Sequence, residues 1–251
     1  MIISHADQET SLREGGKKLH DILYRVADMV RPGLKTIELD QVAERLIREL
    51  GGVPSFKKYR TRGTAMAYPA SLCVSVNDEI VHGIPGERVL EEGDIVGLDI
   101  GMQYQGIFTD TAITVPVGSV SEESADLIKV TRQALDIGIQ EARVGGCIGD
   151  IGAAIQSFVE GKGYAVVREL VGHGVGDAVH EDPEVPNWGT RGVGGRLVEG
   201  MVLALEPMVV LGSRKLKTDK TGWVWLTADG KSAAHFEHTI LLTAQGPQIM
   251  T

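Results

Sequence analysis

Three carboxylate side chains lie in stretches of sequence that are otherwise apolar, and these residues are the first candidates for chemistry. An ionised carboxylate in a low-dielectric interior is destabilising by several kcal/mol unless it is paired, protonated or bound to a metal ion. The chain places few basic residues near these acids, and carboxylates gathered together would repel one another. A divalent cation would relieve both penalties. The three acids are Asp99, Glu206 and Glu237.

For any one of these acids alone, a salt bridge or a turn hydrogen bond is the simpler interpretation. A repeated pattern favours the metal hypothesis, because residues 92–99 and 199–206 both consist of an acid and a glycine, an apolar run, and then a carboxylate. In the same order, His-Gly-Ile-Pro at residues 82–85 resembles His-Gly-Val-Gly at residues 173–176. We therefore predict an internal duplication in which two related halves face one shared site, each supplying a carboxylate and a histidine.

Helices and strands must position these residues. Apolar residues at three- and four-residue spacing predict two helix–turn–helix units, one with a Pro-Gly turn and one with a Gly-Gly turn. Ser11 with Glu14 is typical of a capping box, and Thr36 is placed as an N-cap. Runs rich in β-branched residues predict the strands. The helices are predicted over residues 11–30, 36–50, 121–142 and 150–161, and the strands over 72–76, 94–100, 107–117, 164–171, 201–211, 223–226 and 233–242.

Composition narrows the class of protein. The 251 residues include 34 acids and 25 bases, and the net charge of −9 disfavours nucleic acids and anionic membranes as partners. No stretch is apolar enough to span a membrane, and residues 1–10 lack the pattern of a signal peptide. Two cysteines, Cys73 and Cys147, are too few for a disulfide framework. We expect a cytoplasmic protein with one domain over residues 1–251.

Five motifs that contain metal-binding residue types make the chain resemble the type I methionine aminopeptidases. The resemblance covers nearly the whole chain, and it includes the motifs around His82 and His180, which bind no metal in that family. It implies an α+β pita-bread fold, with pseudo-twofold duplicated halves and a central curved antiparallel sheet covered by helices. The five motifs are Gly97-Leu98-Asp99-Ile100-Gly101, Phe108-Thr109-Asp110-Thr111-Ala112, Gly172-His173-Gly174-Val175-Gly176, Ala204-Leu205-Glu206-Pro207-Met208 and Phe236-Glu237-His238-Thr239.

The resemblance also implies a centre of two divalent metal ions. Asp99 would chelate one ion, and Asp110 and Glu237 would bridge both. His173 and Glu206 would complete the coordination of the second ion. Four carboxylates and one imidazole suit Mn²⁺, Fe²⁺, Co²⁺ or Zn²⁺, and the sequence does not choose among them. A water that bridges two such ions loses a proton near neutral pH, and the resulting hydroxide would attack the first peptide carbonyl.

Three residues would take part in catalysis according to this resemblance. His180 would hydrogen-bond the scissile carbonyl or the oxyanion, and His82 would contact the amide beyond the cut or assist the leaving nitrogen. Glu206 would carry a proton as well as bind metal. From spacing alone, His82 and His180 are equally consistent with loop histidines that stabilise turns. The histidines that we interpret as structural or surface residues are His5, His20, His235 and His238.

Tyr68, Cys73 and Trp223 match the family positions that line the pocket for the methionine side chain. That side chain is an unbranched, polarizable thioether, which suits contacts with aromatic rings and sulfur. Taken singly, each of the three residues is typical of an ordinary core. The resemblance therefore implies substrate-binding roles that the residue types alone do not establish.

Three positions depart from the commonest pattern of the family. Ala65 stands where a tyrosine is usual, and Val179 stands where a phenylalanine usually precedes the second histidine. We expect these two changes to enlarge the pocket or to alter its preference. Gly101 follows the first aspartate where a hydroxyl residue is frequent, so a hydrogen bond that supports the metal ligand would be missing.

The hypothesis is a metal-dependent aminopeptidase that removes the initiator methionine from nascent proteins and prefers a small second residue. Nascent N-termini would be its partners, any ribosome contact would use the surface of the domain itself, and we expect a monomer. Three alternatives stay open. A proline-specific aminopeptidase would use the same fold and a similar metal set, but it normally carries an extra N-terminal domain. A metal-free binding module of this fold would have lost ligand residues, and the acids could be purely structural.

Overall fold

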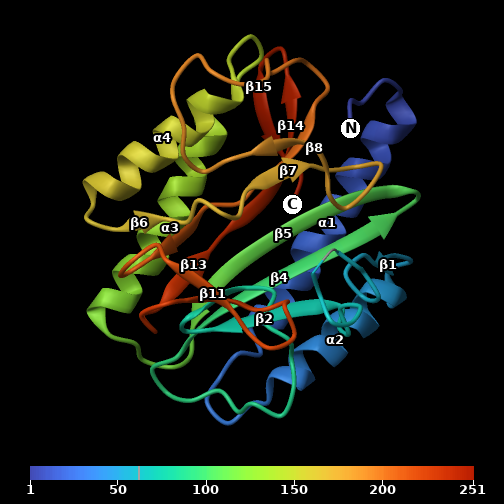
Figure 1. Cartoon of the computed structure of the whole chain (residues 1–251). Helices are drawn as coiled ribbons and strands as arrows, with labels where there is room; N and C mark the ends of the chain where they lie inside the picture. The colour runs from blue at the N-terminus through green and yellow to red at the C-terminus, as the bar shows by residue number, and fades with distance from the viewer. Residues whose placement is uncertain (62) are drawn as a thin grey trace.

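One large antiparallel sheet forms the centre of the molecule (Figure 1). The computed structural model describes residues 1–61 and 63–251. The strand order along the sheet is β1-β4-β5-β14-β9-β7-β8, with β2 paired to β4 and β15 paired to β14. The strands are β1 (Val53–Pro54), β2 (Leu72–Val76), β4 (Ile95–Tyr104), β5 (Ile107–Pro116), β7 (Gly172–Gly174), β8 (Glu181–Val185), β9 (Val202–Leu205), β14 (Glu237–Thr243) and β15 (Gly246–Ile249).

The order of the strands agrees with the predicted duplication. β5 and β14 are antiparallel neighbours in the middle of the sheet, with β4 outside β5 and β9 outside β14. β4 and β9 are the strands that follow the two repeated acid-glycine turns. Two related pairs of strands therefore meet at the centre, and the carboxylates that they carry approach one another there.

Two three-stranded sheets lie beside the large one. Two strands that the sequence pattern predicts as continuous each divide into two shorter strands, one in the large sheet and one in a small sheet. The predicted strand over residues 201–211 stops after Leu205 and resumes as β10, because Pro207 has no N–H for a ladder hydrogen bond. The predicted strand over residues 233–242 divides into β13 and β14 around Phe236. The small sheets are β13 (Ala233–His235), β10 (Met208–Val210) and β6 (Ala165–Val166), and β11 (Leu216–Thr218), β12 (Trp225–Thr227) and β3 (Glu79–Val81).

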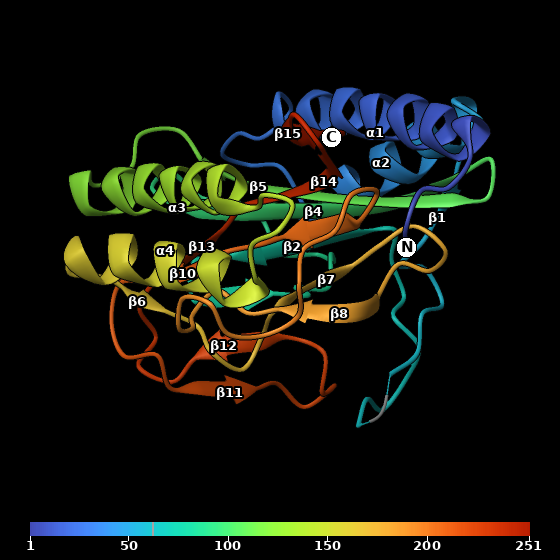
Figure 2. The ribbon, with the colours of Figure 1, turned by 90° about the horizontal axis from the view of Figure 1, so that it is seen from above.

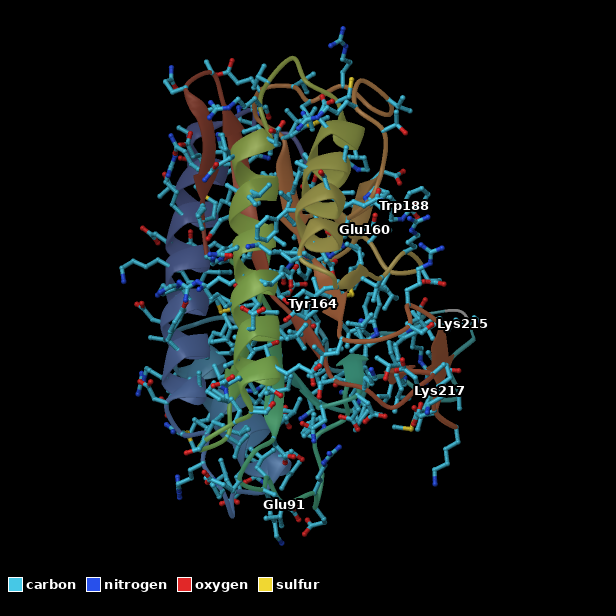
Figure 3. All side chains as sticks on the ribbon, turned by 90° about the vertical axis from the view of Figure 1, so that its left-hand side faces the viewer. Glu91, Glu160, Tyr164, Trp188, Lys215 and Lys217 are labelled. Carbon is cyan, nitrogen blue, oxygen red and sulfur yellow. The ribbon has the colours of Figure 1, made fainter. Side chains whose placement is uncertain are left out.

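Four helices are present in the part of the chain that the structure describes. α1 packs against β4 and β5, and Figure 2 shows α1 and α2 on the opposite side of the sheet from β11 and β12. α3 and α4 lie side by side (Figure 3), and Gly138 permits this, because a Cβ there would come within 2.8 Å of Ile155 Cδ1. None of these helices is long and apolar enough to cross a membrane. Their bounds are α1 (Ala6–Ala27), α2 (Thr36–Glu49), α3 (Glu122–Glu141) and α4 (Ile148–Gly161).

The start of α1 differs from the prediction, because the helix begins at Ala6 and not near Ser11. The Gln8 side chain accepts hydrogen bonds from the backbone N–H groups of Ser4 and His5, over 3.0 and 3.2 Å. This contact satisfies free N–H groups one turn earlier than the predicted capping box would. Ser11 is consequently a buried residue inside the helix.

The main hydrophobic core lies between the helices and the large sheet. Leu19 and Ile22 of α1 and Leu98 of β4 have no exposed surface. Burial of a side chain of this size stabilises the fold by roughly 1.5–3 kcal/mol. Because side chains alternate along a strand, Asp99 points to the face opposite Leu98, away from this core. The core therefore fixes the strands, and the opposite face of the sheet presents polar side chains from a rigid support.

Candidate metal centre and substrate cavity

Strand register places three acids on one face of the sheet. Asp99 of β4 and Glu237 of β14 both pair with Ala112 of β5. Asp99, Ala112 and Glu237 therefore form one row across the three strands. Asp110 precedes Ala112 by two residues, so its side chain points to the same face. One carboxylate oxygen from each of Asp99, Asp110 and Glu237 lies within 4.8 Å of the others.

A second group of ligand atoms adjoins the first. His173 of β7 pairs with Ala204 of β9, and Glu206 follows Ala204 by two residues. Ligand atoms of His173, Glu206 and Glu237 lie within 4.8 Å of one another, and His173 Nε2 is 3.5 Å from Glu206 Oε1. His173 Nδ1 is 2.9 Å from the Gly174 carbonyl oxygen, so Nδ1 carries the proton and Nε2 presents a lone pair. Glu237 belongs to both groups and links them.

The electrostatics of these residues fit a site for divalent cations. Burial raises the pKa of Asp99 to about 7 and that of Glu206 to about 8. Burial also raises the pKa values of Asp110 and Glu237, and the neighbouring carboxylates add to the effect. Asp99 Oδ1 and Glu237 Oε1 are buried and accept no hydrogen bond from the described residues. Such unpartnered oxygens, together with the free Nε2 of the histidine, match the donors that divalent transition metals prefer.

One cavity of about 320 Å³ opens above these acids, and all the predicted site residues line it. Its apolar wall includes Tyr68, Cys73 and Trp223, which are buried and pack with Phe56 and Val179. The Tyr68 and Trp223 rings meet edge to face with centroids 5.2 Å apart. The Tyr68 hydroxyl donates to the Gly83 carbonyl over 2.8 Å, which fixes its ring against the wall. The cavity is thus lined by acidic residues at its base and by an apolar wall on one side.

The backbone around His82 is held in an unusual conformation. His82 has a φ of +60°, in the left-handed region that few residues other than glycine adopt. The next N–H, of Gly83, donates to Ser75 Oγ over 3.0 Å, and a Cβ on Gly83 would come within 2.2 Å of the Val74 carbonyl oxygen. A side chain at that position would not fit. The strained backbone aims the His82 ring into the cavity, where burial lowers its pKa to about 4.

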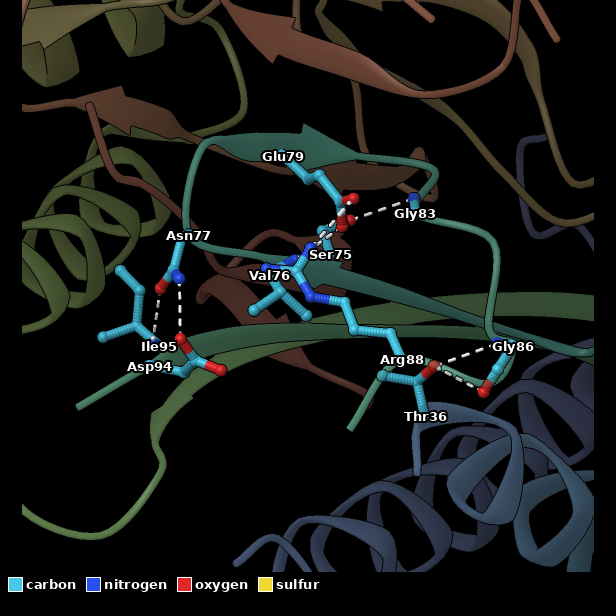
Figure 4. Close-up of polar contacts among 10 residues, drawn as sticks. All are labelled: Thr36, Ser75, Val76, Asn77, Glu79, Gly83, Gly86, Arg88, Asp94 and Ile95. Atoms are coloured by element: carbon cyan, nitrogen blue, oxygen red, sulfur yellow. Dashed lines mark hydrogen bonds and ion pairs between the residues drawn. The ribbon is translucent and has the colours of Figure 1, made fainter. Parts of the chain in front are cut away.

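Polar contacts hold both ends of the segment that carries His82 (Figure 4). On one side, the Val76 N–H donates to Glu79 over 2.8 Å, and Arg88 donates to the other oxygen of Glu79 over 3.2 Å. On the other side, the Gly86 N–H donates to Thr36 Oγ1 over 2.9 Å. Thr36, predicted as an N-cap, is the first residue of α2 and uses its hydroxyl here instead.

His180 also lines the cavity, next to His173 of the second group. Its ring centroid is 4.5 Å from that of His173, in an edge-on arrangement. Its Nδ1 is 2.9 Å from the hydroxyl oxygen of Tyr59. Burial lowers the pKa of His173 to about 4. Desolvation in the cavity and the neighbouring His173 lower the pKa of His180, although part of that side chain is exposed, so both rings are neutral at physiological pH.

Known proteins share this arrangement. The model of metallopeptidase family M24 matches residues 10–244. Methionine aminopeptidase 1 of Bacillus subtilis (strain 168) is 47% identical over 252 residues, which cover 100% of this chain and 99% of that protein. The chain belongs to the methionine aminopeptidases of family M24.

Solved structures confirm the fold that the M24 resemblance implies. The methionine aminopeptidase of Thermotoga maritima has a TM-score of 0.95 at 40% identity, and the match covers 100% of this chain and 99% of that one. An X-Pro aminopeptidase of Thermotoga maritima shows a likeness of fold alone, with a TM-score of 0.77 at 19% identity and 62% of its length covered. The prediction of an α+β pita-bread fold is therefore confirmed.

The structure explains two departures of this M24 chain from the commonest family pattern. Ala65 is outside the cavity lining, and Tyr59 supplies an aromatic side chain to the cavity instead. A Cβ on Gly101 would come within 2.2 Å of Ser55 Oγ, so the Ser55 hydroxyl occupies the space that a side chain at residue 101 would need. The expected enlargement at Ala65 is thus offset by a residue that sequence spacing did not identify.

His235 is a second residue whose place in this M24 site the sequence did not reveal. We interpreted it as structural or surface, and it is buried with only 3% of its surface exposed. Its Nε2 has no hydrogen-bond partner among the described residues and lies 3.5 Å from Glu206 Oε2. No sequence pattern identified it, because the chain passes from one sheet to another at Phe236 and strand alternation therefore does not relate His235 to Glu237.

We expect the metal-free chain to lose stability as pH rises from 7 to 8.5. The folded-state pKa values of Asp99 and Glu206 are raised, so the folded chain still binds protons in a range where the unfolded chain has released them. Stability then falls with rising pH, and roughly one proton over this range corresponds to about 2 kcal/mol, or roughly 5 °C in Tm. The pKa values of His82, His173, His180, His235 and His238 shift in the opposite direction. The stability that they add is nearly complete at pH 7, because unfolded histidines have lost most of their protons there.

Thermal melts in a chelator at pH 7, 7.8 and 8.5 measure this dependence. Adding a divalent cation should reverse the trend, because the ion competes with protons for the same carboxylates. A chelated protein whose Tm is constant or rises over this range would contradict the assignment of buried, protonated acids.

Proposed function

We propose that this chain is an aminopeptidase that removes the N-terminal methionine of nascent proteins, with residues 1–251 acting as one catalytic domain. The observation that carries the proposal is a single cavity that joins an acidic floor, suited to metal ions, to a closed apolar wall. Full-length similarity to methionine aminopeptidases supports the same activity. The substrate would place its α-amine and first carbonyl over the acids and its first side chain against the wall.

The acids and His173 would hold two divalent ions. Asp99 would bind one ion, and Asp110 and Glu237 would be shared between the two. His173 and Glu206 would hold the second ion. Such ions supply an acidified water and polarise the peptide carbonyl. The donor set suits Mn²⁺, Fe²⁺, Co²⁺ or Zn²⁺.

Three side chains of the protein would carry out the remaining tasks. His180 would donate a hydrogen bond to the oxygen of the scissile carbonyl, where negative charge develops during attack. His82, which also lines the cavity, would contact the next amide of the substrate. Glu206 would take a proton from the attacking water and deliver it to the leaving nitrogen, because its carboxylate lies beside the other residues that would hold the ions.

The apolar wall would determine which residue is removed. Tyr68 and Trp223 offer ring faces and edges, and Cys73 offers a polarizable sulfur with a pKa raised by burial, so the thiol stays neutral. An unbranched thioether makes favourable contacts with such a wall. Thr61, Tyr59 and His82 narrow the region beyond the first residue, so a small second residue should be preferred.

Hydrolysis of peptides that begin Met-Ala, Met-Ile, Leu-Ala and Ala-Pro tests the proposal. We expect Met-Ala to be cleaved fastest, with kcat/KM about 10- to 100-fold above Leu-Ala, because pocket shape discriminates similar apolar side chains by this amount. Met-Ile should also be slower than Met-Ala, and Ala-Pro should not be cleaved. The assay needs each candidate metal in turn. Faster cleavage of Ala-Pro would instead favour a proline-specific enzyme. Equal kcat/KM values for Met-Ala and Leu-Ala would show that the apolar wall does not select methionine.

The cellular setting follows from this activity. Nascent N-termini are met in the cytoplasm, so we place the protein there. Any contact with the ribosome would use the surface of this domain, and the site is complete within one chain, which is consistent with a monomer.

A further inference from the structure

Tyr59 is fixed beside His180 by its own backbone. It lies in the loop between β1 and β2, where its N–H donates to the Phe56 carbonyl over 2.9 Å and its carbonyl accepts from the Tyr68 N–H over 2.8 Å. The Tyr59 and His180 rings meet edge to face with centroids 5.1 Å apart. The hydroxyl oxygen of Tyr59 is 2.9 Å from Nδ1 of His180, and it has no other partner among the described residues.

The protons of this pair can be arranged in two ways. A neutral imidazole carries one proton and a phenol carries one, so either the Tyr59 hydroxyl donates to Nδ1 or Nδ1 donates to the hydroxyl. In the first arrangement the proton of His180 is on Nε2, which can donate to a substrate oxygen. In the second arrangement Nε2 is a bare acceptor and would repel that oxygen.

The neighbouring His173 has the opposite arrangement. Its Nδ1 donates to the Gly174 carbonyl, which can only accept, and this leaves Nε2 as a bare acceptor suited to a metal ion. His180 has a hydroxyl at the equivalent atom in place of a carbonyl. Two imidazoles with centroids 4.5 Å apart are therefore set for opposite tasks by different partners of their Nδ1 atoms.

We infer that Tyr59 is a positioning residue, whose hydroxyl donates to Nδ1 of His180 and so keeps a proton on Nε2 for the carbonyl of the substrate. The inference rests on the proposed function for the identity of that carbonyl. The tautomer itself follows from the contact between the two side chains and needs no substrate. Sequence spacing did not identify Tyr59, because the loop that presents it has no periodic pattern.

Kinetics of Tyr59→Phe test the role in turnover. The substitution keeps the ring contact and removes only the hydroxyl, so we expect kcat on a Met-Ala peptide to fall about tenfold while KM changes less than about threefold. In a His180→Ala background the same substitution should change kcat less than about twofold, because Tyr59 acts through His180. Tyr164→Phe is the matched control. Its hydroxyl contacts Asp126 on the outer helices, so kcat should not change.

Nitrogen NMR of the ¹⁵N-histidine-labelled full chain, without metal or substrate, tests the tautomer. The His180 signals are those lost in His180→Ala. They should show protonation at Nε2 in the wild type and a mixture of tautomers in Tyr59→Phe. Protonation at Nδ1 in the wild type overturns the inference, and so does an additive loss of kcat in the double variant. If the chain shows the expected tautomer but releases no methionine, the proposed function is wrong, and so is the hydrogen bond from His180 to the substrate. The assignment of the tautomer would still hold.

Discussion

Glu206→Gln is expected to lower turnover of a Met-Ala peptide at least a thousandfold while the protein stays folded. Glutamine keeps the size of the side chain and loses both the negative charge beside His173 and the ability to take up and release a proton. General acid–base catalysis alone contributes typically 10²- to 10⁴-fold, and loss of a metal ligand adds to the effect. The fold should tolerate the change, because it removes a buried acid that destabilises the metal-free protein.

Circular dichroism and thermal melts in chelator should therefore show an unchanged spectrum and a Tm no lower than that of the wild type. Glu160→Gln is the matched control, because Glu160 is an exposed acid on α4. It should keep full activity. A Glu206→Gln variant that retains wild-type kcat would remove the proton-carrying role of this residue.

Asp110→Asn should abolish the binding of at least one of the two proposed cations. Asp110 is only 2% exposed and lies on the row next to Asp99 and Glu237, so a neutral amide there removes a charge that both ions would share. In the wild type, a cation at about 100 times its Kd adds about 2.7 kcal/mol at each site, which corresponds to a rise in Tm of roughly 5–10 °C per site. We expect the variant to lose the rise that belongs to at least one site.

Equilibrium dialysis with metal analysis measures the stoichiometry directly. The wild type should bind two ions and Asp110→Asn one or none, with turnover reduced about a thousandfold. Asp21→Asn, which changes an exposed acid of α1 paired with Lys17, is the control and should bind two. If Asp110→Asn bound two ions as tightly as the wild type, Asp110 would not be a shared ligand.

Much of the fold could be predicted because its long elements have strong periodic patterns. The strand over 72–76 and the helix over 121–142 agree with β2 and α3 within a residue at each end. The shortest strands could not be predicted, because two or three residues carry too few side chains for alternation to be visible. β1, β3 and β11 are of this kind, and their positions depend on tertiary pairing.

The candidate site follows a similar division. Acids within apolar strands stand out in a sequence, because burial of such residues needs a physical reason, and strand register brings them together as the duplication predicts. Tyr59 and His235 could not be found in this way. One reaches the cavity from an irregular loop, and the other depends on a crossing between two sheets, and neither arrangement leaves a periodic signal.

The proposed ligand residues come from both halves of the molecule, and this sets when the site can exist during synthesis. Asp99 and Glu237 are separated by 138 residues. At a translation rate of about 5–20 residues per second, roughly 7–30 s pass between the synthesis of the first acid and that of the last. During that interval the early acids have no partner strand and no completed cavity. A growing chain of this protein therefore lacks a complete site until Glu237 has been made and β14 has taken its place between β5 and β9.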